Sequence, residues 1–327
     1  MQNKRVAVYR MPNEQDFYSL VSDKPLDIDS LSNNSNFFFS NFENNTTYSF
    51  SSPEKTTNKW PDFHPCLTKT QAEIKEEDYR KKITEITKHI RSNTYKKIVF
   101  SRVKNIEKQP DFELQTTFFS LCKKYPNAFV YCISSPETGT WMGATPEILV
   151  NQIGNKLSTV SLAGTRVEPI QWTDKEKLEQ QVVTDYISEK LIPFSQKLTV
   201  SKPYDINTGS VIHLKSDIDI ELTPNYSIWD VANSLHPTPA VCGIPAEKAK
   251  SFIEKNESHQ RGLYTGYIGP VGINSHSTLF VNLRCMQIGE KKISLYLGGG
   301  IMEDSDPHKE WIETENKAKT LLSVLKH

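Results

Sequence analysis

The chain has 327 residues, of which 39 are basic and 39 acidic, and 37% are hydrophobic. A chain of this length and composition can bury a sizeable core, as one large domain or as two closely joined ones. Its balanced charge, without a basic run interleaved with aromatic residues, offers no electrostatic footprint for nucleic acid and excludes that class of partner.

Membrane and export signals are also missing from the sequence. No stretch approaches 18 consecutive apolar residues, and the N-terminal MQNKRVAVYRMPNEQ lacks the apolar core of a signal peptide. The five cysteines are scattered without CxxC spacing, which indicates reduced thiols buried as small hydrophobes. We therefore expect a cytoplasmic protein with no membrane partner, and we take a monomer as the default state.

The first part of the chain is polar, and helical and strand patterns begin after it. Residues 1–75 are rich in Asn and Ser, with short strands expected at 37–42 and 48–50. Ile83, Ile86 and Ile90 recur at helical spacing, so residues 76–93 are predicted to form an amphipathic helix. The strand KIVFSR follows at 97–102, and its alternation places Lys97 on one face with Ser101.

The middle of the chain predicts a helix, then hairpins, then a second helix. Residues 111–124 carry an apolar stripe at helical spacing, and AFVYCIS, WMGATPEILVNQ and KLSTVSLAGTRV read as antiparallel hairpins separated by Gly-containing turns. A helix is predicted from Thr173 to Leu191, with Thr173 and Glu176 as its capping box. Glu176 and Glu179, three residues apart, share a face of this helix.

The last third alternates loops, a helix and strands. Residues 211–214 lead into an extended stretch, 235–245 form a Pro/Gly-rich loop, and a helix is predicted at 246–257. Three strands follow in RGLYTGYIGPVGI, LFVNLRCMQIG and KKISLYLGGG. Antiparallel strands flanked by helices predict an α+β fold of two or more layers.

The stretch GGGIMEDSDPHKEWIETENK at 298–317 joins a glycine run to a final helix. We expect the glycines to form a strand-to-helix turn, with Asp306 as N-cap and Pro307 as the first helical residue. Glu310, Glu313 and Lys317 then fall within about 60° of arc on one helix face. Free backbone N–H groups at such a turn suit an anion, and the carboxylates suit a hard cation.

Two E-x-x-E pairs therefore lie on two predicted helices, 134 residues apart in the chain. Four carboxylates on two helices can surround one Mg²⁺ ion, which commonly takes one or two of them directly and reaches the rest through water. No His or Cys lies in either pair. An oxygen-only shell argues against zinc and for Mg²⁺.

Eight sequence blocks in order resemble the chorismate-utilising enzymes, a family that includes isochorismate synthase, salicylate synthase and the large subunits of anthranilate and aminodeoxychorismate synthases. The resemblance covers about residues 76–325. Its blocks are KIVFSR at 97–102, GATPE at 143–147, LAGTR at 162–166, E-x-x-E at 176–179, HLKS at 213–216, RGLYTGYIG at 261–269, LFVNLR at 279–284, and GGGI leading to EWIETENK.

The resemblance implies a four-layer α/β/β/α fold, an α+β architecture in which large antiparallel sheets pack face to face with helices outside. Residues 76–327 would form the chorismate-binding catalytic domain, and residues 1–75 a short N-terminal region that contributes strands to the same fold.

The resemblance also implies a set of site residues. Glu179 and Glu313 match direct Mg²⁺ ligands, and Glu176 and Glu310 match their water-bridged partners. The remaining matches concern the substrate. Arg284 and Tyr264 match residues that bind the pyruvyl-ether carboxylate, and backbone N–H groups around Gly299 match donors to a carboxylate. Lys317 matches a lysine of the site, Gly164 and Thr165 match residues that line the site, and His213 matches a histidine near the ring hydroxyl.

Three positions narrow the choice within the family. Lys97 matches the general base of members that add water to chorismate. Ala163 stands where aminodeoxychorismate synthases carry a covalent lysine, and Ala240, a substrate-lining position, stands where members that eliminate pyruvate have Thr. The resemblance therefore implies isochorismate synthase, acting on chorismate without an obligatory amidotransferase subunit. Salicylate synthase is the alternative, followed by an aminating chorismate enzyme subunit.

The implied reaction is a reversible hydroxyl transposition. Lys97 must be neutral to activate water for attack at C2, so we expect desolvation or nearby Mg²⁺ to depress its pKa. Glu147 must be protonated to donate to the leaving C4 hydroxyl, and crowding by carboxylates raises the pKa of a carboxyl group. Whether the product enters menaquinone or siderophore synthesis is left open, because both begin with this step.

Overall fold

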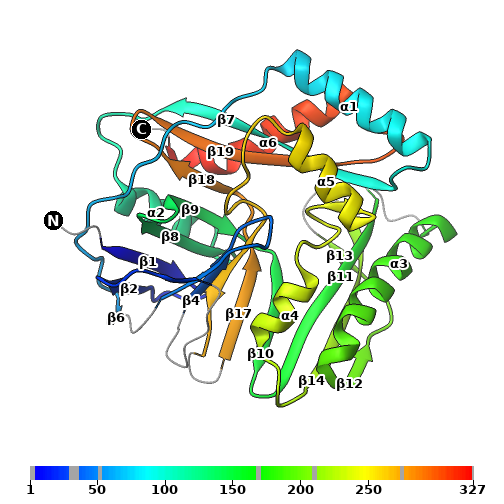
Figure 1. The fold of residues 1–327 in the computed structure, drawn as a ribbon, viewed down its shortest axis with the longest axis horizontal. Coiled ribbons are helices and arrows are strands. Elements are labelled where there is room, and N and C mark those ends of the chain that lie inside the picture. The colour runs from blue at the N-terminus through cyan, green and yellow to red at the C-terminus, as the bar shows by residue number, and fades with distance from the viewer. Residues whose placement is uncertain are drawn as a thin grey trace. The chain divides into compact units, whose positions relative to one another are not determined.

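The computed structural model describes residues 4–28, 37–50, 54–166, 171–207, 212–272 and 276–325, with only the backbone of Thr165, Arg166, Lys175 and Asn207. Its helices are α1 (Glu76–Arg91), α2 (Leu114–Lys124), α3 (Asp174–Leu191), α4 (Ile228–Leu235), α5 (Ala246–Asn256) and α6 (Pro307–Leu325), labelled in Figure 1. The chain divides into two compact units, which we describe separately. The first unit is Met1–Glu147, Pro237–Ile268 and Val281–His327, and the second is Ile148–His236 and Gly269–Phe280.

The first unit is built on an antiparallel sheet of nine strands. Their order is β15-β7-β19-β18-β9-β8-β1-β2-β6. The bounds are β1 (Arg5–Arg10), β2 (Tyr18–Ser22), β6 (Glu54–Thr57), β7 (Lys97–Glu107), β8 (Phe129–Ser135), β9 (Gly139–Thr145), β15 (Gly243–Ile244), β18 (Cys285–Ile288) and β19 (Lys292–Ile301). Strands β7 and β19, the second and third in this order, pair over ten residues, from Lys292 opposite Glu107 to Ile301 opposite Ile98.

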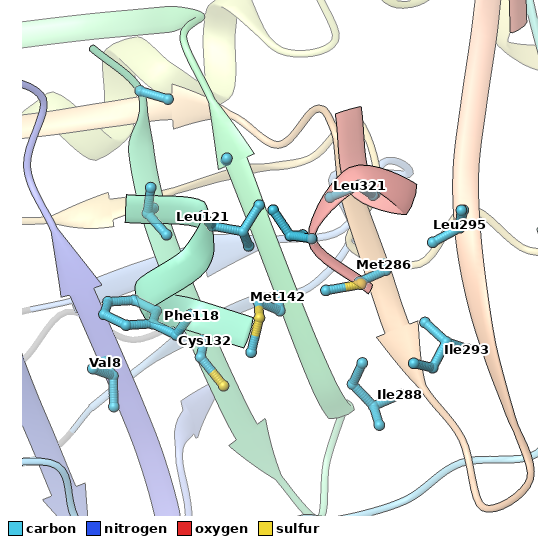
Figure 2. Packing of buried hydrophobic residues seen from close by; sticks show 14 of the residues in the cluster. Val8, Phe118, Leu121, Cys132, Met142, Met286, Ile288, Ile293, Leu295 and Leu321 are labelled. Atoms are coloured by element: carbon cyan, nitrogen blue, oxygen red, sulfur yellow. The ribbon is translucent and has the colours of Figure 1, made fainter. Parts of the chain in front are cut away.

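One face of this sheet packs against α2 and α6. Figure 2 shows Phe118 and Leu121 of α2 and Leu321 of α6 beside Met142 and Met286 of the strands, all of them buried. Burial of this apolar surface, at roughly 25 cal/mol per Å², is the main force that holds the helices on the sheet. Helix α6, which carries three predicted site residues, is therefore anchored along its apolar stripe.

The first unit also contains the short strands β3 (Asp27–Ile28), β4 (Phe37–Ser40) and β5 (Thr47–Ser49) and the first half of β16 (Tyr267–Pro270), which run in the order β16-β4-β5-β3. Phe37 of β4 contacts Tyr9 of β1 and Phe129 of β8, with ring centroids 5.3 and 6.5 Å apart. Two sheets therefore pack face to face within the first unit, as the resemblance implies.

Helices α1 and α5 cover the end of β7 that begins with Lys97. The isoleucines predicted to form the buried stripe of α1, Ile83, Ile86 and Ile90, pack with Ile98 and Phe100 of β7. Figure 1 shows α1 next to α6, and the two helices are in contact. The strand that carries the predicted base is thus embedded in a core.

The second unit has strands in the order β12-β14-β11-β10-β17, with β13 pairing to β14. The bounds are β10 (Ile148–Ile153), β11 (Lys156–Arg166), β12 (Ser195–Val200), β13 (Tyr204–Asn207), β14 (Ile212–Leu222) and β17 (His276–Val281), with a short 3-10 helix at Ile192–Phe194. Helix α3 lies against β11 and β14 (Figure 1). Gln180 of α3 is buried and donates to Ser161 of β11, with an Nε2–Oγ distance of 3.0 Å.

Most predicted elements are confirmed. The helices expected at 76–93, 111–124, 173–191 and 246–257 are present, and β8–β9 and β10–β11 are antiparallel hairpins. Asp306 caps α6, because its Oδ1 accepts from the N–H groups of His308 and Lys309 at 3.0 and 2.8 Å. The α+β class with two antiparallel sheets is also confirmed.

Three expectations were wrong or incomplete. The stretch LFVNLRCMQIG is not one strand, because Asn282, Leu283 and Arg284 separate β17 from β18 and Arg284 has φ +49°. Helix α4 was not predicted, although Ser227 and Asp230 form a capping box at its start. The glycines at 298–300 are not a turn but the last part of β19.

Within the described ranges, none of the helices combines the length and the apolarity that a bilayer crossing requires.

Candidate active site

Lys97 is the first residue of β7, and its half-buried side chain lies over the last glycines of β19. Gly300 pairs with Val99, so by strand alternation Gly300, Val99 and Lys97 share one face of the sheet. A Cβ placed on Gly300 would lie 2.8 Å from Lys97 Cε and 3.4 Å from Nζ. The lysine side chain therefore lies across the glycine, and a Cβ at this position would require the lysine to move.

The glycines at 298–300 leave space for neighbouring side chains on both faces of β19. A Cβ on Gly298 would lie 2.8 Å from the Tyr264 hydroxyl, on the same face as Lys97. A Cβ on Gly299 would point to the other face and lie 3.0 Å from Glu310 Oε2 and 3.9 Å from Glu313 Oε1. This is the physical reason that three strand residues lack side chains, where the sequence had suggested a turn.

The face of α6 that approaches Gly299 carries the second E-x-x-E pair. Glu310 is only 9% exposed, and its Oε1 accepts a hydrogen bond of 2.6 Å from Ser305 Oγ. Glu313 is half exposed and pairs with Lys317 at 2.7 Å, while Lys317 Nζ donates to the Gly298 carbonyl at 2.8 Å. The predicted shared face of Glu310, Glu313 and Lys317 is thus present.

One carboxylate oxygen of Glu310, Oε2, is buried without a hydrogen-bond donor among the described residues. Burial raises the pKa of Glu310, the Ser305 hydrogen bond opposes that rise, and the nearby charge of Glu313 adds to it. A buried carboxylate oxygen without a donor is costly unless a cation or a proton reaches it, so this pair fits a Mg²⁺ ion.

Glu147 lies at the end of the β9 hairpin in a fixed backbone turn. Thr145 Oγ1 donates to the Val281 carbonyl at 2.6 Å, and the Glu147 carbonyl accepts from the Val281 N–H at 2.9 Å. Burial raises the pKa of Glu147, while the positive charges of Arg284 and Lys97 partly offset that rise. Burial therefore shifts the pKa of the predicted acid toward the protonated form, and the charge of the predicted base acts on the same carboxyl group.

Tyr264 and Arg284 lie at two turns with unusual backbone geometry. Tyr264 is buried, and burial raises its pKa, so its hydroxyl stays protonated and can donate to a carboxylate. The next residue, Thr265, has φ +60° although it is β-branched, and its N–H donates to the Asn282 carbonyl at 2.8 Å. Arg284 is exposed at φ +49°. Left-handed non-glycine residues of this kind cluster at functional sites.

In the second unit, a β-bulge brings together Gly164 and His213. The register of β11 against β14 shifts between Ala163 and Thr165, and Gly164 has φ +70°. His213 Nδ1 lies 3.0 Å from the Gly164 carbonyl. A carbonyl only accepts, so Nδ1 carries the ring proton and Nε2 becomes an acceptor in the neutral ring. Thr165 pairs with His213 through the backbone.

Helix α3 carries the first E-x-x-E pair. The Thr173 N–H and Oγ1 both donate to Glu176 Oε2, at 2.9 and 3.1 Å, so the predicted capping box is confirmed. Glu179 lies almost one turn further along and is partly exposed. A Cβ on Gly164 would lie 3.6 Å from Glu176 Cβ, which places this pair next to the bulge.

The predicted site residues therefore fall into two groups. The first unit contains Lys97, Glu147, Ala240, Tyr264, Arg284, Gly299, Glu310, Glu313 and Lys317, and the second contains Gly164, Thr165, Glu176, Glu179 and His213. In the part of the chain that the structure describes, no three His, Cys, Asp or Glu side chains gather to hold a metal ion. The four predicted carboxylates are two pairs, one in each unit.

Sequence reasoning missed a buried ion pair in the first unit, between Glu257 and Arg261 at 2.7 Å. Its only signal in the sequence is the four-residue spacing of opposite charges. That spacing is common on solvated surfaces and did not distinguish this pair.

Comparisons with known proteins place these features in context. The family model described as chorismate binding enzyme matches residues 31–326. Isochorismate synthase DhbC of Bacillus subtilis is 31% identical over 269 residues, which cover 76% of this chain and 68% of that protein. The match thus spans about two thirds of the relative.

Two solved structures share the fold. A Bacillus anthracis protein assigned as a 2,3-dihydroxybenzoate-specific isochorismate synthase, DhbC, superposes with a TM-score of 0.81 at 25% identity, over 98% of this chain and 96% of that one. MenF, the menaquinone-specific isochorismate synthase of Escherichia coli, superposes with a TM-score of 0.82 over 100% of this chain and 90% of that one. At 20% identity, this second likeness concerns the fold alone.

Proposed function

The chain belongs to the chorismate binding enzymes, and we propose that it is an isochorismate synthase, which adds water at C2 of chorismate and releases the C4 hydroxyl. One observation carries the proposal. Glu147, whose pKa is raised by burial, is held within the electrostatic reach of Lys97 in a single unit, which is the pairing of acid and base that such a transposition needs. The relatives named isochorismate synthase agree with it.

Lys97 is assigned the role of general base. Its ammonium lies over Gly300, where the missing side chain leaves the lysine room beside the strand. In its neutral form the amine takes a proton from water as the oxygen attacks C2. A general base of this kind contributes about 10²- to 10⁴-fold to the rate.

Glu147 is assigned the role of general acid. Its pKa is raised by burial, so the carboxyl holds a proton at higher pH than an exposed glutamate does. That proton passes to the C4 hydroxyl, which leaves as water. In the reverse direction the two groups exchange roles, because each then starts in the other protonation state.

The remaining residues are assigned to binding. The protonated Tyr264 hydroxyl and the Arg284 guanidinium suit the pyruvyl carboxylate, since both donate hydrogen bonds and one is charged. His213 Nε2, an acceptor once Nδ1 donates to Gly164, suits a ring hydroxyl. Lys317 and the backbone N–H groups around Gly299 suit the ring carboxylate.

Glu310 and Glu313 of the first unit are assigned to Mg²⁺, and the resemblance assigns Glu176 and Glu179 of the second unit to the same kind of ligand. The buried, partnerless Oε2 of Glu310 supports a cation at this end of α6. When bound, the ion would neutralise the ring carboxylate and draw negative charge toward it as the double bonds shift. Glu310 and Glu313 would hold the ion in place, and the positive charge of Lys317 would offset part of the negative charge of the two glutamates.

Two small residues argue against the competing activities. Ala163 offers no amine for covalent amination, and Ala240 leaves no hydroxyl where the pyruvate-eliminating members have Thr. The proposal is therefore water addition without salicylate formation and without an ammonia-supplying partner. The proposal assigns the product to neither the menaquinone nor the siderophore route, because both begin with this step.

The test is product analysis with purified protein, chorismate and MgCl₂, without glutamine or ammonium. We expect an equilibrium mixture of chorismate and isochorismate, reached from either side and measured by liquid chromatography. Lys97→Ala should lower kcat about 10²- to 10⁴-fold, while Lys96→Ala, at its exposed neighbour, should leave kcat unchanged. Formation of salicylate and pyruvate, or normal turnover by Lys97→Ala, would contradict the proposal.

A further inference from the structure

The outer edge of β7 has a strand partner only as far as Ile98. Strand β15 pairs only with Lys97 and Ile98, and the last backbone contact on this side is the Val99 N–H donating to the Cys242 carbonyl at 2.8 Å. Beyond it, the Val99 carbonyl and the Ser101 N–H point to the same edge, where a neighbouring strand would satisfy them. Buried backbone groups of this kind need partners.

The side chains of Glu257 and Arg261 supply those partners. Arg261 Nη2 donates to the Val99 carbonyl at 2.8 Å, and Glu257 Oε1 accepts from the Ser101 N–H at 2.7 Å. One donor and one acceptor on adjacent side chains thus continue the hydrogen-bond ladder that β15 leaves unfinished. Both side chains are only 2% exposed.

Arg261 also contacts two further segments that lie next to predicted site residues. Its Nη1 donates to the Val241 carbonyl at 2.9 Å, next to Ala240, and to Thr265 Oγ1 at 3.2 Å, next to Tyr264. Its planar guanidinium has a donor for each direction, which a lysine ammonium cannot match in geometry. Arg261 therefore hydrogen-bonds to three chain segments, at Val99, Val241 and Thr265.

Glu257 holds the guanidinium in this orientation. Its two carboxylate oxygens accept from Arg261 Nε at 2.8 Å and from Nη2 at 2.7 Å, a bidentate pair. Glu257 Oε1 also accepts from Ser101 Oγ at 2.8 Å. The buried imidazole of His259 lies nearby, with Nε2 3.6 Å from Glu257 Oε2, and burial lowers its pKa, which favours the neutral ring. Arg261 is the permanently charged partner of Glu257.

We propose that Glu257 and Arg261 are positioning residues for catalysis, which replace a missing strand beside β7 and fix Lys97 relative to the segments of Tyr264 and Ala240. The inference rests on the proposed function, because it assigns the catalytic benefit to Lys97. Neither residue is proposed to touch the reacting atoms. Their effect passes through the backbone of Val99 and Ser101, two and four residues after the lysine.

The test compares Arg261→Lys and Glu257→Gln with a matched control, Arg10→Lys. Arg10 is also a buried arginine of the first unit, and it donates to the carbonyls of Tyr125, Pro126 and Ala128. All variants are assayed well below their melting transitions, with the folded fraction measured by circular dichroism. Rates are then expressed per folded molecule.

We expect Arg261→Lys and Glu257→Gln to lower kcat at least tenfold, with the Mg²⁺ concentration for half-maximal activity unchanged, because α6 is not disturbed. Arg10→Lys should lower the melting temperature but leave kcat within twofold of the unchanged protein. A wild-type kcat in both site variants, or an equal loss of kcat in Arg10→Lys, would overturn the inference.

Amide hydrogen exchange gives a second readout that needs no turnover. The amides of Val99–Ser101 should exchange at least tenfold faster in Arg261→Lys and Glu257→Gln, while those of β8 keep their protection. Unchanged protection at Val99–Ser101 would overturn the positioning role. If the unaltered protein fails to convert chorismate, the proposed function falls, and this exchange measurement still decides whether the ion pair fixes β7.

Discussion

Gly300→Ala is the substitution that most directly tests the placement of Lys97. The new Cβ would lie 2.8 Å from Lys97 Cε, whereas ordinary contact begins at 3.4 Å, so the lysine must move by about 0.6 Å. Displacements on the order of 1 Å at reacting groups cost about 10²-fold in rate. We therefore expect kcat to fall roughly 10- to 100-fold.

The fold should tolerate this change. Gly300 is not among the residues with positive φ, and it pairs with Val99 in a regular ladder, so alanine can adopt its conformation. Replacing a glycine at a compatible position adds about 0.4–1 kcal/mol by reducing the entropy of the unfolded chain. The thermal melt should therefore stay level or rise while activity falls.

Gly299→Ala is the matched comparison, one residue away on the opposite face. Its Cβ would lie 3.0 Å from Glu310 Oε2, so the Mg²⁺ requirement should rise and kcat at saturating Mg²⁺ should change less. The assay is chorismate turnover against Mg²⁺ concentration for both variants. A wild-type kcat in Gly300→Ala, or identical profiles for the two variants, would refute the two-faced arrangement around β19.

Three further predictions follow from the site. Burial raises the pKa of Glu147, so the active protonated form is lost as pH rises through that pKa; Glu147→Gln should lower kcat by about 10²- to 10⁴-fold and remove the alkaline limb of the pH–rate profile. Burial also raises the pKa of Glu310, so the stability that its protonated form contributes is present below about pH 4.3, the unfolded value, and is lost as pH rises through the folded pKa. Glu310→Gln should therefore be more stable by about 1 kcal/mol in urea titrations at pH 8 with EDTA, should match the unaltered protein at pH 4, and should gain less stability from Mg²⁺. His213→Asn keeps a donor toward the Gly164 carbonyl but loses the Nε2 acceptor, and we expect kcat/KM for chorismate to fall about tenfold with an unchanged circular dichroism spectrum.

The helices and their faces were accessible from sequence because they depend on residues three and four apart. The isoleucine stripe of α1 is buried as predicted, and Asp306 and Pro307 start α6. Glu310, Glu313 and Lys317 share a face because helix geometry places them there. Thr173 and Glu176 cap α3 for the same local reason.

The assignment of roles came from the order of the matched blocks rather than from physics. On residue type alone, Lys97 is an ordinary strand lysine and Glu147 a hairpin glutamate. The structure adds the burial that raises the pKa of Glu147 and the glycine that gives Lys97 its space. The roles themselves remain predictions until the variants are assayed.

What the sequence by itself determined is local: the periodic helices, the caps, the hairpins and the two acidic pairs. The tertiary structure alone decided that the glycines at 298–300 form a strand, that Arg284 interrupts a predicted one, and that Glu257 and Arg261 complete the edge of β7. Each of these depends on a partner far away in the chain, such as Val99 for Arg261. Hydrogen-bond ladders and side-chain clashes between distant segments leave no periodic signal, so the pairing that creates them had to be seen in three dimensions.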